Sequence, residues 1–149
     1  MKSNNLNGRK FIIGYTSGVY DLFHIGHLNI LKNAKSLCDK LIVGVSSDEL
    51  VMEYKKKIPI IPFEERLEII RNIKFVDAVI KQETMNKLLI WEKLKFDIMI
   101  VGDDWHKTKK WEDIESSLKE RGVMTMFFPH TQGTSSTLIN EILLRERDI

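Results

Sequence analysis

Two histidines three residues apart, His24 and His27, are the side chains whose types and spacing most directly suggest chemistry. They lie where an apolar run gives way to a helical pattern, and this spacing lets both rings face the same side of a helix start. Gly26 between them removes a Cβ where a bulky ligand could approach. A helix start offers unpaired backbone N–H groups and the positive end of its dipole, so the segment favours binding of a polyphosphate.

The histidine pair has two other interpretations, a metal site and a simple helix cap. Zinc would need further ligands. The other histidines are His106 and His130, and Cys38 falls within a helical pattern. We therefore favour phosphate binding over metal binding, with helix capping as the remaining alternative.

Two later segments carry hydroxyls or carboxylates next to predicted element ends. Residues 133–137 place Gly, Ser and Thr at the start of the last predicted helix, where they could bind phosphates, although Ser135 could equally be an N-cap. Asp103 and Asp104 directly follow an apolar run. Either carboxylate could bind a metal or cap the turn before the next helix.

A lysine cluster at residues 55–57 precedes Pro59. Most runs of lysine are solvated surface. Here the cluster follows a predicted strand, where ligands bind in such folds. A bound polyphosphate needs positive charge around it, so we expect these lysines to bind substrate.

The elements that must position these groups alternate between apolar runs and amphipathic stretches. Strands are predicted at 11–15, 41–45, 76–80, 98–101 and 123–128. Helices are predicted at 26–37, 63–73, 85–94, 112–121 and 135–144, with Gly122 ending the fourth. This order predicts an α/β fold with a doubly wound, mainly parallel five-stranded sheet and helices on both faces.

In such sheets ligands bind beyond the carboxyl ends of the strands. That rule selects four segments, 18–27, 46–57, 102–106 and 129–137, all rich in small, polar or ionisable residues. We expect a flexible segment at 1–9 and a single domain at 10–149.

Composition narrows the class of protein. The chain has 149 residues, 43% hydrophobic and 30% charged, which is ordinary for one globular domain. A net charge of +2 gives no broad footprint for nucleic acid, and a single cysteine permits no internal disulfide. The sequence shows neither a signal peptide nor a membrane-spanning stretch, so we expect a cytoplasmic protein without nucleic-acid or membrane partners.

Three segments together resemble the cytidylyltransferases of the H-x-G-H nucleotidyltransferase superfamily, and most closely those that act on glycerol 3-phosphate. Residues 18–27 look like the family's nucleotide loop and residues 102–105 like its G-D-D-W segment. Residues 131–137 are similar to its T-x-G-I-S-T-T signature. The three segments occur in the family's order, and the resemblance extends over nearly the whole chain after Lys10.

The resemblance implies a Rossmann-like fold, a homodimer and Mg²⁺ bound with CTP, with no metal ligand assigned on the protein. It implies transfer of CMP from CTP to a small alcohol phosphate. Glycerol 3-phosphate is the first expectation, and phosphocholine, phosphoethanolamine and other polyol phosphates follow. An adenylyltransferase of the same superfamily and a catalytically silent nucleotide-binding module are the alternatives.

Matching by position gives each candidate residue a role. The catalytic candidates are His24, His27, Lys55 and Lys57. The nucleotide-binding candidates are Gly18, Val19, Tyr20, Asp21, Gly26, Gly102, Asp104, Trp105, Thr131, Gly133, Ser135, Ser136 and Thr137. The acceptor-binding candidates are Arg66, Lys74 and His130.

Two of the acceptor candidates depart from the family pattern, which usually has arginine where this chain has Lys74 and His130. Lysine loses the planar bidentate fork of arginine, and histidine is only partly charged near neutral pH. The acceptor therefore stays open. Arg66 has an alternative of its own, as an exposed helix residue paired with a nearby glutamate such as Glu65.

Overall fold

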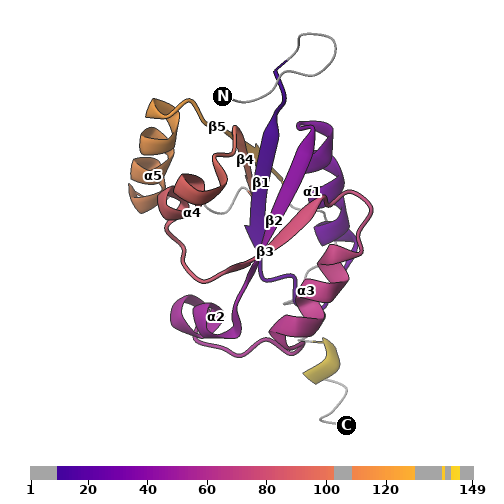
Figure 1. Cartoon of the computed structure of the whole chain (residues 1–149). Coiled ribbons are helices and arrows are strands. Elements are labelled where there is room, and N and C mark those ends of the chain that lie inside the picture. Colours follow the sequence, from indigo (N-terminus) through magenta and orange to yellow (C-terminus); the bar gives the residue numbers. More distant parts are fainter. Residues whose placement is uncertain (1–9, 103–108, 130–138, 140–141, 145–149) are drawn as a thin grey trace.

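The computed structural model describes residues 10–102, 109–129, 139 and 142–144 (Figure 1). Its sheet has five strands in the order β3-β2-β1-β4-β5, and every neighbouring pair is parallel. The strands are β1 (Ile13–Gly18), β2 (Lys40–Ser46), β3 (Ala78–Gln82), β4 (Ile98–Gly102) and β5 (Met124–Phe128). The predicted five-stranded α/β sheet is confirmed, and it is parallel throughout.

Five helices are described: α1 (Ile25–Ser36), α2 (Asp48–Lys55), α3 (Phe63–Arg71), α4 (Lys87–Leu94) and α5 (Lys109–Glu120). In Figure 1, α1 and α3 lie on one side of the sheet, and α4 and α5 lie on the other. Because both faces are covered, the central strands are buried on both sides and their sequences are continuous apolar runs rather than alternating ones.

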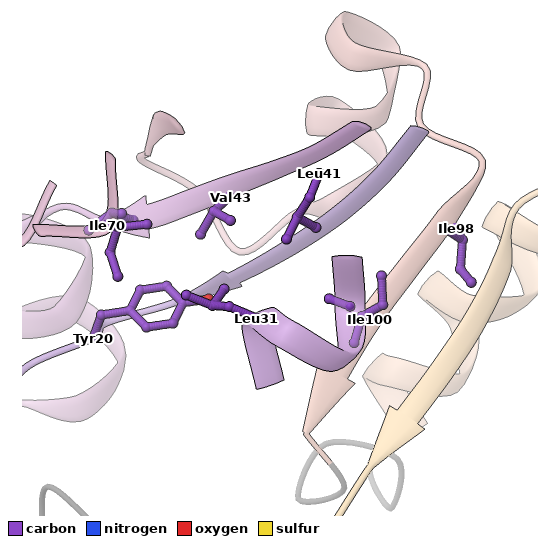
Figure 2. Close-up of a cluster of buried hydrophobic side chains, with 9 residues drawn as sticks. Tyr20, Leu31, Leu41, Val43, Ile70, Ile98 and Ile100 are labelled. Carbon is purple, nitrogen blue, oxygen red and sulfur yellow. The ribbon is translucent and has the colours of Figure 1, made fainter. Parts of the chain in front are cut away.

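The core between the sheet and the α1–α3 layer is aliphatic. Figure 2 shows Leu41, Val43 and Ile100 of the strands together with Leu31 of α1 and Ile70 of α3. All five side chains are fully buried. The opposite core is more aromatic. It includes Tyr15, Phe96 and Trp111, and the Tyr15 and Phe96 rings are stacked with centroids 5.2 Å apart.

Helix α2 was not predicted, because residues 46–57 were interpreted only as a segment beyond a strand end. Ser47 caps this helix, its Oγ accepting a hydrogen bond from the Leu50 N–H at 3.1 Å. Only Leu50 and Val51 are buried, and eight residues are too few to display a helical period. The helix ends at Lys55, with Lys56 in the left-handed region at φ 57°.

Strand β1 is shifted relative to the strand predicted at 11–15 and includes Thr16 and Ser17, which lie beyond the predicted end. The Asp39 carboxylate accepts from the Ile12 N–H at 2.7 Å, and the Asp97 carboxylate accepts from the Ile13 N–H at 2.9 Å. These long-range contacts set where the strand begins, so its start could not be derived locally. Gly122, at φ 82°, follows the last turn of α5 as predicted.

Two predictions fall mostly or wholly on residues outside the described part of the chain. Residues 1–9 lie outside it entirely. Of the helix predicted at 135–144, positions 139 and 142–144 are described, and these are helical.

Candidate active site

Two adjoining cavities lie at the carboxyl ends of the strands. We call the first the histidine cavity. Its volume is about 200 Å³, and its lining includes Gly18, Val19, Tyr20, Asp21, His27, Lys55, Lys57 and Gly102. We call the second the lysine cavity. Its volume is about 440 Å³, and its lining includes Ser17, Gln82, Met85, Lys87, Lys110 and Trp111. The two share Ser17, Gly18, Val19, Lys55 and Gly102.

The histidine pair caps α1 through its Nδ1 atoms. The Gly26 N–H donates to His24 Nδ1 at 3.0 Å, and the His24 N–H donates to His27 Nδ1 at 3.2 Å. This reciprocal arrangement is a capping box, so the capping alternative is correct as a description of Nδ1. In a neutral ring whose Nδ1 accepts, the proton is on Nε2. Capping therefore leaves one N–H donor on each ring for a ligand.

The two rings lie together and favour the neutral form. Their centroids are 3.9 Å apart in a stacked arrangement, and His27 lines the histidine cavity. Burial, with a further contribution from His24, lowers the pKa of His27 to about 4. Burial also lowers the pKa of His24. At neutral pH the pair thus offers hydrogen-bond donors without adding positive charge.

The loop from β1 to α1 is conformationally strained. Tyr20 and Leu22 have φ values of 58° and 51°, a region that residues with a side chain rarely adopt. Tyr20 is held by burial in the core, and its ring meets that of His27 edge-on at 5.5 Å. The tight bend puts residues 18–22 along the wall of the histidine cavity.

Asp21 joins this loop to the segment that follows the lysines. Its carboxylate accepts from the Ile60 N–H at 2.8 Å and from the Ile61 N–H at 2.9 Å. Lys55 and Lys57 both line the histidine cavity. The structure therefore brings these two predicted catalytic lysines together with His27, although residues 27 and 55 are far apart in the chain.

Arg66 is fully buried, so its interpretation as an exposed helix residue paired with its own helix is wrong. Its guanidinium donates to the carbonyl oxygens of Val19 and Ser46 at 2.7 and 2.9 Å, and to that of Ile61 at 2.8 Å. It also pairs with Asp48 at 2.5 Å. These bonds make Arg66 a positioning residue that ties the ends of β1 and β2 to the segment between α2 and α3. Its contact with an acceptor stays a prediction.

Lys74 is exposed, and its ammonium lies 5.3 Å from the centroid of the Phe75 ring. It precedes β3, so it is at the amino-terminal edge of the sheet, and it lines neither cavity. In the single chain, Lys74 is therefore not near the other candidate site residues. Its acceptor role also stays a prediction.

Sequence reasoning missed the residues at the end of β3. Lys87, the first residue of α4, is buried and donates to Ser17 Oγ at 2.6 Å and to Gln82 Oε1 at 3.0 Å. Tyr15 Oη donates to the same Gln82 oxygen at 2.5 Å. Burial lowers the pKa of Lys87 to about 7. The strand-end rule was applied to four strands and omitted β3, although residues 82–87 satisfy it equally well.

A family model described as cytidylyltransferase-like matches residues 15–142 of this chain. The chain belongs to the cytidylyltransferase-like family. The match starts in β1 and includes both cavities, so the family assignment and the site geometry refer to the same part of the molecule.

Curated relatives of the chain are named as nucleotidyltransferases but differ in substrate. Glycerol-3-phosphate cytidylyltransferase of Bacillus subtilis is 32% identical over 85% of this chain and 92% of its own length. Ethanolamine-phosphate cytidylyltransferase of Arabidopsis thaliana is 34% identical over 97% of this chain. The chain spans only 36% of that enzyme's length. An FAD synthase of Pyrococcus abyssi is 42% identical over 65% of this chain and 66% of its own length.

Solved structures support the Rossmann-like fold of the family. A lipopolysaccharide core biosynthesis protein of Thermoplasma volcanium superposes with a TM-score of 0.67 at 28% identity, covering 83% of this chain and 98% of its own. Pantoate-beta-alanine ligase of Francisella tularensis has a TM-score of 0.63 at 14% identity, covering 93% and 71% of the two chains. The second likeness shows the fold alone.

The remaining family positions lie outside the described residues. They are Asp104, Trp105, His130, Thr131, Gly133, Ser135, Ser136 and Thr137. Gly102, just before them, ends β4 and lines both cavities. Within the described ranges there is no cluster of three or more metal-ligating side chains, and no helix has the length and apolar character needed to span a bilayer.

Proposed function

We propose that this protein transfers CMP from CTP to a small alcohol phosphate, with glycerol 3-phosphate as the first candidate, giving a CDP-alcohol and pyrophosphate. The observation that carries the proposal is the pair of neutral histidines anchored through Nδ1, of which His27 lines the same cavity as Lys55 and Lys57. Together they offer donors and positive charge where a triphosphate would lie. The named cytidylyltransferases among the relatives support the nucleotide.

The reaction is an in-line displacement at phosphorus. An oxygen of the acceptor phosphate forms a bond to the α-phosphorus of CTP, and the bond from that phosphorus to the bridging oxygen of the β-phosphate breaks. The electron pair leaves with pyrophosphate. A phosphate monoester is already anionic at pH 7, so no strong general base is needed, and catalysis depends on alignment and on charge stabilisation.

Each side chain has a part in this scheme. His24 and His27 donate from Nε2 to phosphate oxygens and bind them more strongly as charge develops in the transition state. Lys57 adds positive charge in the histidine cavity. Lys55 lines both cavities, so we place it where the nucleotide and the acceptor phosphate meet.

Mg²⁺ fits this site as an ion carried by the nucleotide. Asp21 is the one carboxylate among the described residues that line the histidine cavity, and it already accepts two backbone hydrogen bonds. Phosphate oxygens would therefore supply most of the ligands, as is common for Mg²⁺. The ion would neutralise phosphate charge. Asp104 and Trp105 as a cytidine pocket, and residues 131–137 as a second phosphate contact, are part of the same proposal.

The test is release of pyrophosphate by the purified chain with Mg²⁺, using CTP or ATP and a panel of acceptors. The panel comprises glycerol 3-phosphate, phosphoethanolamine, phosphocholine and other polyol phosphates. We expect turnover with CTP to exceed that with ATP by at least about tenfold, equivalent to about 1.4 kcal/mol of discrimination. A preference for ATP, or nucleotide binding without turnover on any acceptor, would reject the proposal.

The FAD synthases among the relatives favour one second candidate, an adenylyltransferase acting on a phosphorylated vitamin. The same assay with ATP and FMN separates the two, because the product FAD is identified by its absorbance after chromatography. Formation of FAD faster than any CDP-alcohol would establish this second function.

A further inference from the structure

The ring of His27 is packed against three other aromatic rings. Its centroid lies 3.9 Å from that of His24, 5.3 Å from that of Phe23 and 5.5 Å from that of Tyr20. The His24 ring stacks on it, whereas the Tyr20 ring stands at 72° to it. Close packing leaves a ring few orientations, so these neighbours also fix the direction of its N–H donor.

Of these rings, that of Tyr20 is carried by a strained backbone. Tyr20 has a φ of 58° and Leu22, two residues later, has a φ of 51°. Residues with a side chain rarely adopt this left-handed region. Such a conformation persists where the surrounding structure over-determines it, and it is typical of functional sites. The bend at Tyr20 therefore indicates a role for the side chain that it places.

The Tyr20 ring is fixed to the sheet. Tyr20 is 5% exposed, and Figure 2 shows its ring directed toward Leu31 of α1, within the aliphatic core. A side-chain hydrogen bond joins Tyr20 to Thr16 of β1, and Thr16 Oγ1 donates to the Ile100 carbonyl oxygen of β4 at 2.8 Å. Gly18 leaves room for the ring, because a Cβ there would lie 3.1 Å from it. The ring is thus held by two strands.

The capping bond alone restrains His27 weakly. The His24 N–H donates to His27 Nδ1 at 3.2 Å, which is at the long end of the usual range. His27 and Leu31 are one turn apart on α1, so they share the face of the helix on which Tyr20 packs. A fixed aromatic edge on this face adds a restraint on the imidazole that the capping bond does not supply.

We propose that Tyr20 is a positioning residue, whose ring edge holds the His27 ring in the orientation that directs Nε2 into the histidine cavity. This inference rests on the proposed function, since it concerns a donor that His27 offers to a bound phosphate. The Tyr20 side chain acts through His27 and does not itself bind substrate. A donor that is held in place before the reaction needs no reorganisation as charge develops, so its orientation affects kcat.

The first test compares two substitutions at Tyr20. Tyr20→Phe keeps the ring edge and loses the hydroxyl, whereas Tyr20→Leu keeps apolar bulk and loses the ring. Pyrophosphate release is measured with CTP and the best acceptor of the panel. We expect kcat to fall about tenfold in Tyr20→Leu and less than about threefold in Tyr20→Phe. The KM for CTP should change less than about threefold in both, because the lost restraint acts mainly in the transition state.

Leu41→Ala is the control for loss of core packing. Leu41 is fully buried in the same core cluster as Tyr20, but it lies near the start of β2, away from the carboxyl ends of the strands. Its melting temperature should fall at least as much as that of Tyr20→Leu, with kcat within about twofold of wild type. An equal loss of kcat in Leu41→Ala and Tyr20→Leu, or in Tyr20→Phe and Tyr20→Leu, would overturn the inference.

A second test does not require turnover. The His27 ring signal in the NMR spectrum, assigned by its absence from His27→Asn, is followed from pH 8 to pH 5 in the free proteins. The other ionisable groups facing His27 or its cavity are His24 of α1, Asp21 of the preceding loop, Lys55 of α2 and Lys57. Burial lowers the pKa of His27 to about 4, so wild type and Tyr20→Phe should barely titrate in this range. In Tyr20→Leu, water reaches the ring, and we expect its pKa to rise above 5 toward its ordinary value of about 6.5.

Inorganic triphosphate, added to the same samples, distinguishes failure of this inference from failure of the proposed function. It should shift the His27 signal in wild type and in Tyr20→Phe with an affinity about fivefold higher than in Tyr20→Leu. If it does so and no acceptor is turned over, the proposed function fails and the positioning role of Tyr20 stands. If the pKa of His27 and its response to triphosphate are the same in Tyr20→Leu as in wild type, the inference is overturned, whatever the turnover.

Discussion

The two cavities share the end of β1 and Lys55, but their ionisable groups are held in different ways. His27, which lines the histidine cavity, and its neighbour His24 each accept through Nδ1 a backbone N–H of the loop or helix to which they belong. In the lysine cavity, Lys87 is held by Gln82 at the end of the preceding strand β3 and by Ser17 of β1, which is far from it in sequence. Contacts within one segment produce a recognisable motif, whereas contacts between distant segments produce no motif.

The largest expected effect is at Arg66, which supports both cavities through Val19 and Ser46. Arg66→Met leaves three backbone carbonyls without their donors, and we expect a loss of about 3 kcal/mol in the free energy of unfolding, measured with urea. Arg66→Lys retains the charge but not the planar fork, so its loss should be intermediate. A loss below about 0.5 kcal/mol in Arg66→Met would show that the cavities do not depend on a common support.

The next effect separates capping from phosphate binding at His24. Asparagine is a good N-cap, so His24→Asn keeps an acceptor for the Gly26 N–H but lacks Nε2. We expect kcat to fall about 100-fold, equivalent to about 2.7 kcal/mol, with little change in unfolding. His24→Ala should lose the same activity and also about 1 kcal/mol of stability.

Wild-type turnover in His24→Asn would contradict the phosphate assignment and reduce the pair to a helix cap. In that case the histidine cavity would be a structural feature of the loop, and the contrast with the lysine cavity would lose its functional meaning.

Acid should destabilise the fold through His27, because the ring is anchored in its neutral form. This prediction tests how the ionisable group of the histidine cavity is held. The pKa of His27 is about 4 in the folded chain, against about 6.5 when unfolded, so the unfolded chain takes up the proton first as pH falls. Its contribution to stability is complete above pH 6.5 and is lost as pH falls toward 4. Between pH 7 and pH 5 the loss should be about 2 kcal/mol, measured by urea unfolding at each pH.

His27→Asn is the matched control, since it keeps an acceptor and cannot titrate. The difference in stability between wild type and this variant should shrink as pH falls from 7 to 5. A constant difference would show that His27 is protonated as readily in the folded chain as in the unfolded one.

The smallest effect is expected at Asp21, which joins the loop from β1 to α1 to residues 60 and 61. Asp21→Asn keeps one acceptor oxygen and turns an amide toward the second N–H, so we expect a loss of about 1 kcal/mol in unfolding. We expect a loss of about the same free energy in catalysis, which is a decrease of about fivefold in kcat/KM for CTP. Glu83→Gln, a change at an exposed residue that lines neither cavity, should alter neither quantity. If Asp21→Asn lost more free energy of unfolding than Arg66→Met, Asp21 rather than Arg66 would be the main support of the site.

Much of the fold could be predicted because local patterns and burial agree. All five apolar runs contain strands, the central ones are buried on both faces, and the helix between the first two strands carries its apolar residues at helical spacing. Helix α2 could not be predicted, since its buried face consists of Leu50 and Val51 alone. The start of β1 was misplaced because Asp39 and Asp97 hold the preceding backbone from a distance.

The candidate site divides in the same manner. The helix start formed by His24, Gly26 and His27 could be predicted, together with its capping by a histidine, because all three residues lie in one short segment. The internal positions of Arg66 and Lys87 could not, because lysine and arginine are usually exposed and their burial depends on which distant oxygens surround them.

By itself, the sequence determined the order of the elements and the alternation that makes a parallel sheet, and it predicted polyphosphate binding at one loop. These follow from side-chain periodicity and from residues close together in the chain. Only the tertiary structure decided that Nδ1 of each histidine is occupied by the backbone, that Arg66 is an internal support, and that Lys87 is buried in a second cavity. Those properties depend on solvent exclusion and on partners from separate strands, which exist only after the chain has folded.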